Sequence, residues 1–158
     1  MPTASNTTRR ARPPRGPLSI FMVEDEPLVQ DSLRVVLGGF LGAEVVGSAN
    51  SEAEAISWLQ AHDDAWRIAV VDLFLQQGTG LGVLSWLAPM KNGRTVIALT
   101  NAATRANREQ CLQLGADAVF DKSEEINEFL SFCEGASTGT TPAVALASKA
   151  TARTSGRA

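Results

Sequence analysis

Carboxylates, a hydroxyl and an ammonium group follow the short apolar runs of this 158-residue chain. The run Ile68–Val71 leads directly into Asp72, and a continuous apolar run of this kind is typical of a strand buried on both faces of a parallel sheet. The polar groups that follow the other runs are Glu24, Asp25, Thr100 and Lys122. Because the carboxyl ends of parallel strands share one edge of a sheet, we expect all of these side chains to lie together.

Three carboxylates beside one ammonium restrict the chemistry of this edge. Glu24, Asp25 and Asp72 would repel one another unless a cation neutralised them. Hard oxygen ligands that leave room for water suit Mg²⁺, and a metal held in this way neutralises phosphoryl oxygens. Lys122 and Thr100 could hold the remaining phosphoryl oxygens. An aspartate can itself be the nucleophile, so the edge indicates phosphoryl transfer through an aspartyl phosphate.

Five strand-and-helix pairs, in strict alternation, are expected to position these groups. The expected strands cover residues 18–23, 44–49, 68–72, 95–99 and 116–120. Pro27 suits the first turn of the first helix, which we expect Gly38, Gly39 and Gly42 to end, and Ser123 is expected to cap the last helix. Alternation with short connections predicts an α/β fold, with a parallel, doubly wound sheet covered by helices on both faces.

Two basic ends flank an acidic centre. Residues 1–17 carry four arginines and no acid, and residues 136–158 carry three basic residues and no acid. Neither end can bury enough apolar surface to offset its conformational entropy, so we expect a disordered arm and a disordered tail. Residues 18–135 then form one domain with a formal charge of −10. This charge argues against direct binding of nucleic acid, and the lack of a long apolar run argues against a membrane span.

The cysteines and the histidine offer no second centre of chemistry. Cys111 and Cys133 each lie in a helical pattern and lack the spacing of a zinc site. A reduced, cytoplasmic location is the simplest interpretation. His62 lies beside Asp63 and Asp64 at the polar end of a helix and is interpreted as a surface residue.

The glycines after Asp72 invite a dinucleotide-binding interpretation. Gly78, Gly80 and Gly82 lie between a strand and a helix, as the glycines of a phosphate-binding loop do. Their spacing differs from the GxGxxG fingerprint, and Asp72 would repel a pyrophosphate. The sequence therefore disfavours this interpretation.

Five short pieces of sequence, taken in order, resemble the receiver domain of two-component response regulators. They are Val-Glu-Asp-Glu-Pro at 23–27, Val-Asp-Leu-Phe-Leu at 71–75 with its glycines, Leu-Thr at 99–100, Gly-Ala-Asp at 115–117 and Asp-Lys-Ser at 121–123. The resemblance covers about residues 18–134 and implies a (βα)5 flavodoxin-like fold with strand order 2-1-3-4-5. It implies a signalling domain, not an enzyme. The sequence after Gly135 does not have the pattern of an output module, so a stand-alone receiver is expected.

The resemblance also implies a role for each residue at the edge. Asp72 would accept a phosphoryl group from a histidine kinase or a histidine phosphotransfer protein. Thr100 and Lys122 would bind that group, and the shift of Thr100 would rearrange the face made by helix four, strand five and helix five. The implied Mg²⁺ ligands are Asp25, Asp72, the backbone carbonyl of Phe74 and, through a water, Glu24.

The expected partners are proteins. A kinase or phosphotransfer protein would supply the phosphoryl group, and an output protein of unknown identity would bind the phosphorylated form. Trp58 and Trp86 are interpreted as helix-packing residues, although an exposed pair would favour a weak homodimer over a monomer.

Three positions depart from the pattern of the family. Ser123 stands where proline is usual, Asn101 stands where a small residue is common, and Val119 stands in the position of a switching aromatic, with Phe120 beside it. These departures leave open an interaction module that kept the fold but works without phosphorylation. A small Mg²⁺-dependent phosphohydrolase is a weaker alternative, because no second acid–base group or substrate-cap insertion accompanies Asp72.

Overall fold

The computed structural model describes residues 16–138 and contains the expected alternation of strands and helices. The strands are β1 (Ser19–Val23), β2 (Glu44–Ala49), β3 (Ile68–Val71), β4 (Thr95–Thr100) and β5 (Ala118–Asp121). The helices are α1 (Pro27–Leu41), α2 (Glu52–Ala61), α3 (Gly80–Leu87), the 3-10 turn η1 (Ala88–Met90), α4 (Arg105–Gln113) and α5 (Ile126–Ser137). None of these helices is long and apolar enough to cross a membrane.

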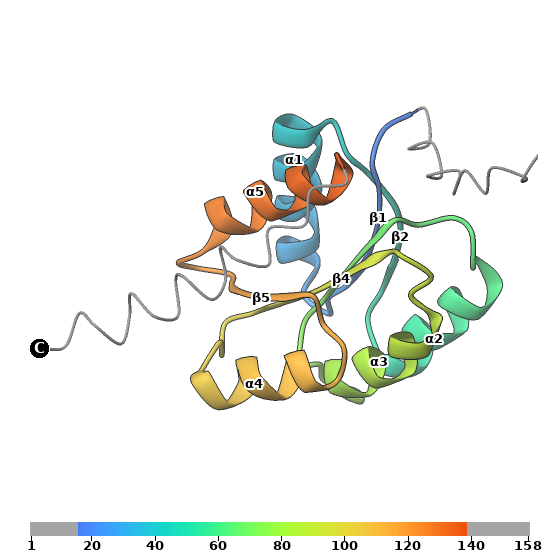
Figure 1. The fold of residues 1–158 in the computed structure, drawn as a ribbon, viewed down its shortest axis with the longest axis vertical. Helices are drawn as coiled ribbons and strands as arrows, with labels where there is room; N and C mark the ends of the chain where they lie inside the picture. The colour runs from blue at the N-terminus through green and yellow to red at the C-terminus, as the bar shows by residue number, and fades with distance from the viewer. Residues whose placement is uncertain (1–15, 139–158) are drawn as a thin grey trace, which may run out of the picture.

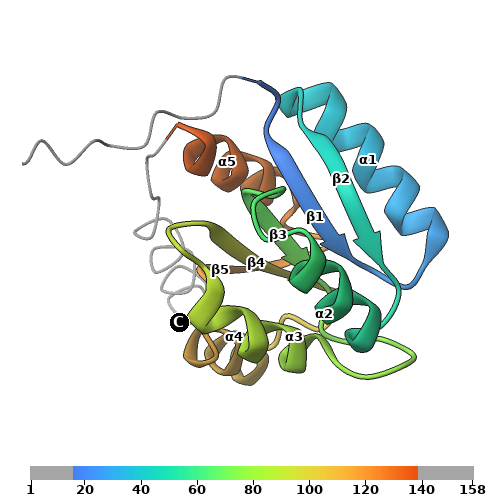
Figure 2. The same ribbon diagram turned by 90° about the vertical axis from the view of Figure 1, so that its right-hand side faces the viewer.

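The strands form one parallel sheet in the order β2-β1-β3-β4-β5, which confirms the predicted topology. Helices α1 and α5 cover one face, and α2, α3 and α4 cover the other (Figures 1 and 2). In β3, Ile68 and Val70 pack toward α1 and α5, whereas Ala69 and Val71 pack into the cluster on the opposite face. Both faces of this strand are therefore buried, which explains its unbroken apolar run.

Helix α1 is longer than its glycines predict. It continues through Gly38 and Gly39, which are exposed, and ends at Gly42. Each internal glycine costs about 1 kcal/mol relative to alanine, and the burial of Leu33 and Leu37 outweighs this cost. Gly42 has a φ of +59°, a left-handed conformation that glycine adopts without strain, so only this part of the expected helix end is confirmed.

The expected cap at Ser123 is wrong. Asp121 Oδ1 accepts hydrogen bonds from the backbone N–H groups of Ser123 at 2.8 Å and Glu124 at 3.0 Å. These bonds form a turn between β5 and α5, and the helix begins only at Ile126. Asp121 therefore satisfies the backbone groups that a serine cap was expected to satisfy.

Helix α5 also runs past the expected domain boundary at residue 135. It includes Gly135 and ends at Ser137, because Ala136 still packs against the core under α1 and α5. The rest of the arm and tail expected to be disordered, residues 1–15 and 139–158, lies outside the described residues.

The residues interpreted as core-packing side chains are confirmed in that role. The Trp58 ring stacks on Phe21 with centroids 4.2 Å apart, and Trp86 packs partly buried against the core. Cys111 and Cys133 are both buried free thiols. Burial raises the pKa of Cys111 to about 11 and that of Cys133 to about 12, so both are protonated at neutral pH.

Candidate functional site

The carboxyl ends of the strands bring the predicted acidic residues together. One carboxylate oxygen from each of Glu24, Asp25 and Asp72 lies within 4.8 Å of the others. Glu24 and Asp25 follow β1, and Asp72 follows β3, which pairs directly with β1. The parallel register of these two strands thus aligns their ends and makes the cluster.

Lys122 reaches this cluster from the end of β5. Its Nζ lies 3.0 Å from Asp72 Oδ2 and also forms an ion pair with Glu24 Oε2. The backbone N–H of Lys122 donates to the carbonyl of Thr100 at 3.0 Å, which fixes the position from which the side chain extends. The predicted proximity of Lys122 and Asp72 is confirmed.

Burial and ion pairing have opposite effects on the pKa of Glu24 and on the pKa of Lys122. Glu24 is only 1% exposed, and burial raises the pKa of its carboxyl above the usual value, although Lys122 opposes this effect. Burial alone would lower the pKa of Lys122, but Glu24 and Asp72 together raise it. The Lys122 ammonium is therefore charged at neutral pH.

Asp25 is held by the loop that follows β3. Its Oδ2 accepts a hydrogen bond of 2.7 Å from the backbone N–H of Gln76. We call residues 72–80, which connect β3 to α3, the acceptor loop. The sequence reasoning missed the role of Gln76, because a backbone N–H leaves no signature in the residue type.

Phe74 lies in the acceptor loop and is 62% exposed. Its backbone N–H donates to Asp72 Oδ1 at 3.4 Å, and its backbone forms an isolated antiparallel bridge with Thr79. The bridge closes the loop on itself, so the backbone of Phe74 is fixed beside Asp72.

Thr100 is fully buried at the end of β4. Its hydroxyl accepts a hydrogen bond of 3.1 Å from the backbone N–H of Ala102. The hydrogen bonds of the described residues include none between Thr100 and Asp72. The hydroxyl is thus engaged with the start of the connection to α4.

Two of the departures from the family pattern meet at the surface of this edge. Ser123 Oγ donates a hydrogen bond of 3.1 Å to Asn101 Oδ1. This bond joins the connection after β4 to the turn after β5, the two segments that carry Thr100 and Lys122. The peptide bonds of the described residues, including the one between Lys122 and Ser123, are trans.

The third departure, Val119, is completely buried in β5. The neighbouring Phe120 packs edge-on against Phe129 and Phe132 of α5, with centroids 6.1 and 5.6 Å away. The aromatic ring of β5 is therefore in the core between the sheet and α5, on the face opposite α4.

Arg108 of α4 lies across the other side of β5. It donates to the carbonyls of Ala103 at 2.8 Å and Val119 at 3.2 Å, and it forms an ion pair with Glu125 Oε1. The same Glu125 oxygen accepts the backbone N–H of Asp121 at 3.1 Å. The sequence reasoning missed this pair, because the two residues are separated by a strand and a turn.

The donor set at the edge fits a divalent cation. Three carboxylates face one ammonium, so the cluster of Glu24, Asp25, Asp72 and Lys122 carries a formal charge of −2 when all four groups are ionised. Carboxylate and carbonyl oxygens are the ligands that Mg²⁺ prefers. The residues present could hold such an ion with water in its remaining positions.

Comparisons with known proteins agree with this geometry. The sequence model described as response regulator receiver domain matches residues 20–134. A Pseudomonas aeruginosa protein described as "Putative transcriptional regulator" is 28% identical over 111 residues, which are 70% of this chain and 52% of that protein. The chain therefore spans about half the length of this curated relative.

Solved structures share the fold. The crystal structure of a two-component response regulator of the LuxR family from Aurantimonas sp. SI85-9A1 has a TM-score of 0.70 at 21% identity, over 80% of this chain and 89% of that chain. A Burkholderia pseudomallei response regulator, solved with a phosphorylated aspartic acid, a calcium ion and citrate, has a TM-score of 0.65 at 23% identity, over 77% and 69% of the two chains.

Proposed function

This chain belongs to the response regulator receiver family, and from that membership we propose that it is a phosphorylation switch whose acceptor is Asp72. The observation that carries the proposal is the position of the Asp72 carboxylate. It is almost buried, shares its site with Glu24 and Asp25, and lies 3.0 Å from the Lys122 ammonium. Receiver domains bind Mg²⁺ at an acidic pocket of this kind.

The proposed reaction transfers a phosphoryl group from a phosphohistidine of a kinase or phosphotransfer protein. A carboxylate oxygen of Asp72 attacks phosphorus, a P–O bond forms, and the P–N bond breaks with its electron pair returning to the imidazole. A bound Mg²⁺ would supply charge neutralisation on the phosphoryl oxygens, held by Asp25, Asp72 and the Phe74 carbonyl, with Glu24 acting through a water.

Lys122 and Thr100 are proposed to bind the transferred phosphoryl group. The ammonium of Lys122 pairs with the carboxylates before transfer and with a phosphoryl oxygen after it, so its charge stays compensated. The Thr100 hydroxyl accepts the N–H of Ala102 and still has its own hydrogen to donate to another phosphoryl oxygen. A shift of Thr100 toward that oxygen would therefore pull on the connection between β4 and α4.

The output face is proposed to be the surface of α4, β5 and α5. Helix α4 buries a single residue, Cys111, whereas α5 buries four. Few buried contacts mean a low free energy of local opening, so α4 is the element that a shift of Thr100 moves most easily. The affinity of a partner protein that binds this face would then depend on whether Asp72 is phosphorylated.

Intact-mass spectrometry tests the assignment of the acceptor. The natural chain, Asp72→Asn and the exposed control Asp64→Asn are incubated with acetyl phosphate, with and without Mg²⁺. We expect one phosphoryl adduct that requires Mg²⁺, persists in Asp64→Asn and is absent from Asp72→Asn. If acetyl phosphate gives no adduct, a phosphorylated histidine kinase or phosphotransfer protein replaces it. An adduct that survives in Asp72→Asn contradicts the proposal.

A second candidate function is an interaction module that does not need phosphorylation. The hydrogen bond between Ser123 and Asn101 favours it, because it ties together the two segments that would have to move. This candidate predicts that Asp72→Asn binds its partner as tightly as the natural chain does. A loss of partner binding in Asp72→Asn would exclude it.

A further inference from the structure

We propose that Glu52, the first residue of α2, is a positioning residue that holds the acceptor loop in the shape that binds Mg²⁺. The inference rests on the proposed function, because it takes Asp25 and the Phe74 carbonyl as metal ligands. Glu52 lies outside the carboxylate cluster and would touch neither the metal nor the phosphoryl group. It acts through the backbone of the loop.

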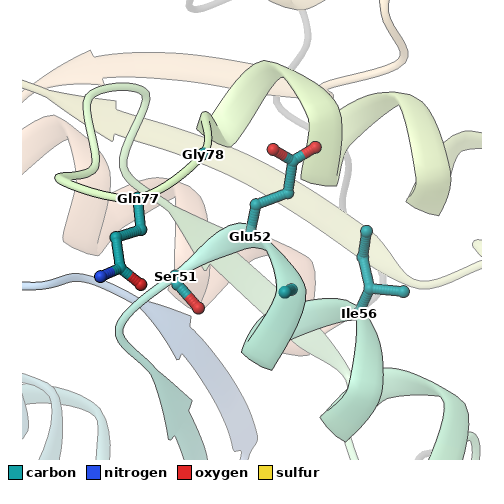
Figure 3. Close-up of a pocket in the computed structure, with 6 residues that line it drawn as sticks. Ser51, Glu52, Ile56, Gln77 and Gly78 are labelled. Atoms are coloured by element: carbon teal, nitrogen blue, oxygen red, sulfur yellow. The ribbon is translucent and has the colours of Figure 1, made fainter.

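Two hydrogen bonds join Glu52 to the tip of the acceptor loop. Glu52 Oε2 accepts the backbone N–H of Thr79 at 3.0 Å, and the backbone N–H of Glu52 donates to the carbonyl of Gln77 at 3.2 Å. Figure 3 shows the side chain extending from the start of α2 toward the segment that joins Gly78 to α3. Side chain and backbone of one residue thus hold the loop at two points on either side of Gly78.

The unusual glycine spacing provides the room for Glu52. A Cβ at Gly82 would overlap Glu52 Oε1, and a Cβ at Gly78 would lie 2.6 Å from Glu52 Oε2, closer than a Cβ approaches a non-bonded atom in real proteins. Gly78 also has a φ of +79°, which other residues rarely adopt. The two glycines that suggested a nucleotide loop therefore accommodate a carboxylate of the chain itself.

The third glycine, Gly80, packs closely against the backbone of Asp72. A Cβ at Gly80 would overlap the backbone carbonyl of Asp72, and the Gly80 N–H donates to the carbonyl of Leu73 at 3.0 Å. The loop is thus folded tightly onto the residue proposed to be phosphorylated. Gly78 and Gly80 of the loop, and Gly82 of α3, thus serve contacts within the protein.

The hold on the tip reaches the proposed metal ligands through the backbone. Thr79, which Glu52 binds, forms the bridge with Phe74, and the N–H of Gln76 binds Asp25. A displaced tip would change the direction of the Phe74 carbonyl and the orientation of Asp25 together. Groups that orient metal ligands in this way typically change metal affinity by about 10- to 100-fold when they are removed.

Three variants distinguish the effect of the loop position from the effect of the Glu52 charge. Glu52→Ala removes the acceptor for Thr79, whereas Glu52→Gln keeps an acceptor oxygen and removes the charge. Gly82→Ala keeps every charge and favours the helix by propensity, but its methyl group occupies the space of Glu52 Oε1. Glu54→Ala removes a carboxylate from the same turn of α2 and serves as the matched control.

Isothermal titration with Mg²⁺, beside urea unfolding in EDTA, measures the effect on binding apart from the effect on stability. We expect Glu52→Ala and Gly82→Ala each to weaken Mg²⁺ binding about tenfold. Glu52→Gln and Glu54→Ala should stay within about threefold of the natural chain, since neither removes the hydrogen bond to Thr79. The double variant Glu52→Ala with Gly82→Ala should bind no more weakly than either single variant, because both remove the same contact.

The outcomes that overturn the inference are distinct from those that overturn the proposed function. Mg²⁺ affinity unchanged in both Glu52→Ala and Gly82→Ala would exclude a positioning role while leaving the acceptor site intact. Equal losses in Glu52→Gln and Glu52→Ala would assign the effect to charge and overturn the inference. No binding of Mg²⁺ by the natural chain would overturn both proposals.

Discussion

Two clusters of largely buried charge lie near the carboxyl ends of the strands, and they differ in the balance of positive and negative groups. The site cluster consists of Glu24, Asp25, Asp72 and Lys122, and it contains more carboxylates than cations. The β5 cluster consists of Arg108 and Glu125, which neutralise each other. The first cluster leaves charge for a ligand to neutralise, and the second leaves none.

The clusters also differ in how the backbone takes part. In the β5 cluster, the Arg108 guanidinium donates to two backbone carbonyls, and Glu125 accepts from the N–H of Asp121. In the site cluster, the backbone bonds go to the carboxylates, as with Gln76 and Asp25. A complete set of partners stabilises a fixed structure, whereas an excess of like charge makes stability depend on a bound cation. We therefore expect the β5 cluster to contribute mainly to stability and the site cluster to bind a cation.

The largest expected effect is the loss of stability when the β5 cluster is broken. Arg108→Met should lower the free energy of unfolding by about 3 kcal/mol, because Glu125 stays buried after its guanidinium partner is removed. Urea denaturation measures this change. The matched control is Arg105→Met on the same helix, whose pair with Glu109 is exposed and contributes about 0.5 kcal/mol or less. Equal effects of the two variants would refute the structural role of the β5 cluster.

The next effect is the local opening of α4, which can be measured from the reactivity of Cys111 and Cys133. Cys111 is the only buried residue of α4, whereas Cys133 is one of four in α5. A thiol reagent added to the folded chain should modify Cys111 at least about tenfold faster than Cys133, since α4 opens at lower free energy. Arg108→Met should accelerate the modification of Cys111 further and so increase the ratio of the Cys111 rate to the Cys133 rate.

Unfolding both sites in urea gives the control, because the two thiols should then react at similar rates. Equal protection of Cys111 and Cys133 in the folded chain would contradict the low free energy of local opening expected for α4.

The site cluster should respond to Mg²⁺, and the β5 cluster should not. Mg²⁺ at ten times its dissociation constant should stabilise the natural chain by about 1.4 kcal/mol, as mass action requires. Arg108→Met should gain the same free energy of unfolding from Mg²⁺, although its free energy of unfolding without Mg²⁺ is lower. Asp25→Asn should lose most of this gain, because a proposed ligand is missing. A gain in Asp25→Asn equal to that of the natural chain would place the ion elsewhere.

The smallest expected effect is a decline in stability at alkaline pH. The pKa of Cys111 is raised to about 11 and that of Cys133 to about 12, both above the ordinary value of 9.0. The unfolded chain therefore releases thiol protons at lower pH than the folded chain does, so stability falls as pH rises past 9. Between pH 8 and 9.5 the loss should be about 1 kcal/mol or less per thiol, and Cys133→Ala should flatten the slope. A slope that is unchanged in this variant would contradict the assignment.

The sequence was sufficient to predict the site cluster because its geometry follows from topology. Once the apolar runs are taken as parallel strands, Asp72 and Lys122 must meet at one edge, and the structure confirms that they do. The roles of these residues in phosphoryl transfer stay predictions. The helix ends were less predictable, since Gly38 and Gly39 remain helical for reasons of packing that no local pattern contains.

The β5 cluster and Glu52 could not be predicted in the same way. The contact between Arg108 and Glu125 depends on how α4 packs against β5. The contact between Glu52 and Thr79 depends on how α2 packs against a loop residue 27 positions away in the sequence. Gly78 and Gly82 were visible signals of the second contact, but a glycine shows only that space is needed. What fills the space becomes clear when the helices are in place.

The most direct test of Asp72 as the acceptor locates the phosphoryl group chemically. After incubation with acetyl phosphate and Mg²⁺, or with a phosphorylated donor protein, borohydride reduces an acyl phosphate to an alcohol and leaves phosphoesters unchanged. Peptide mass spectrometry then identifies the converted residue. We expect conversion of Asp72 to homoserine and of no other acidic residue. Conversion at Asp25, or a phosphate that resists borohydride, would contradict the assignment of Asp72 as the acceptor.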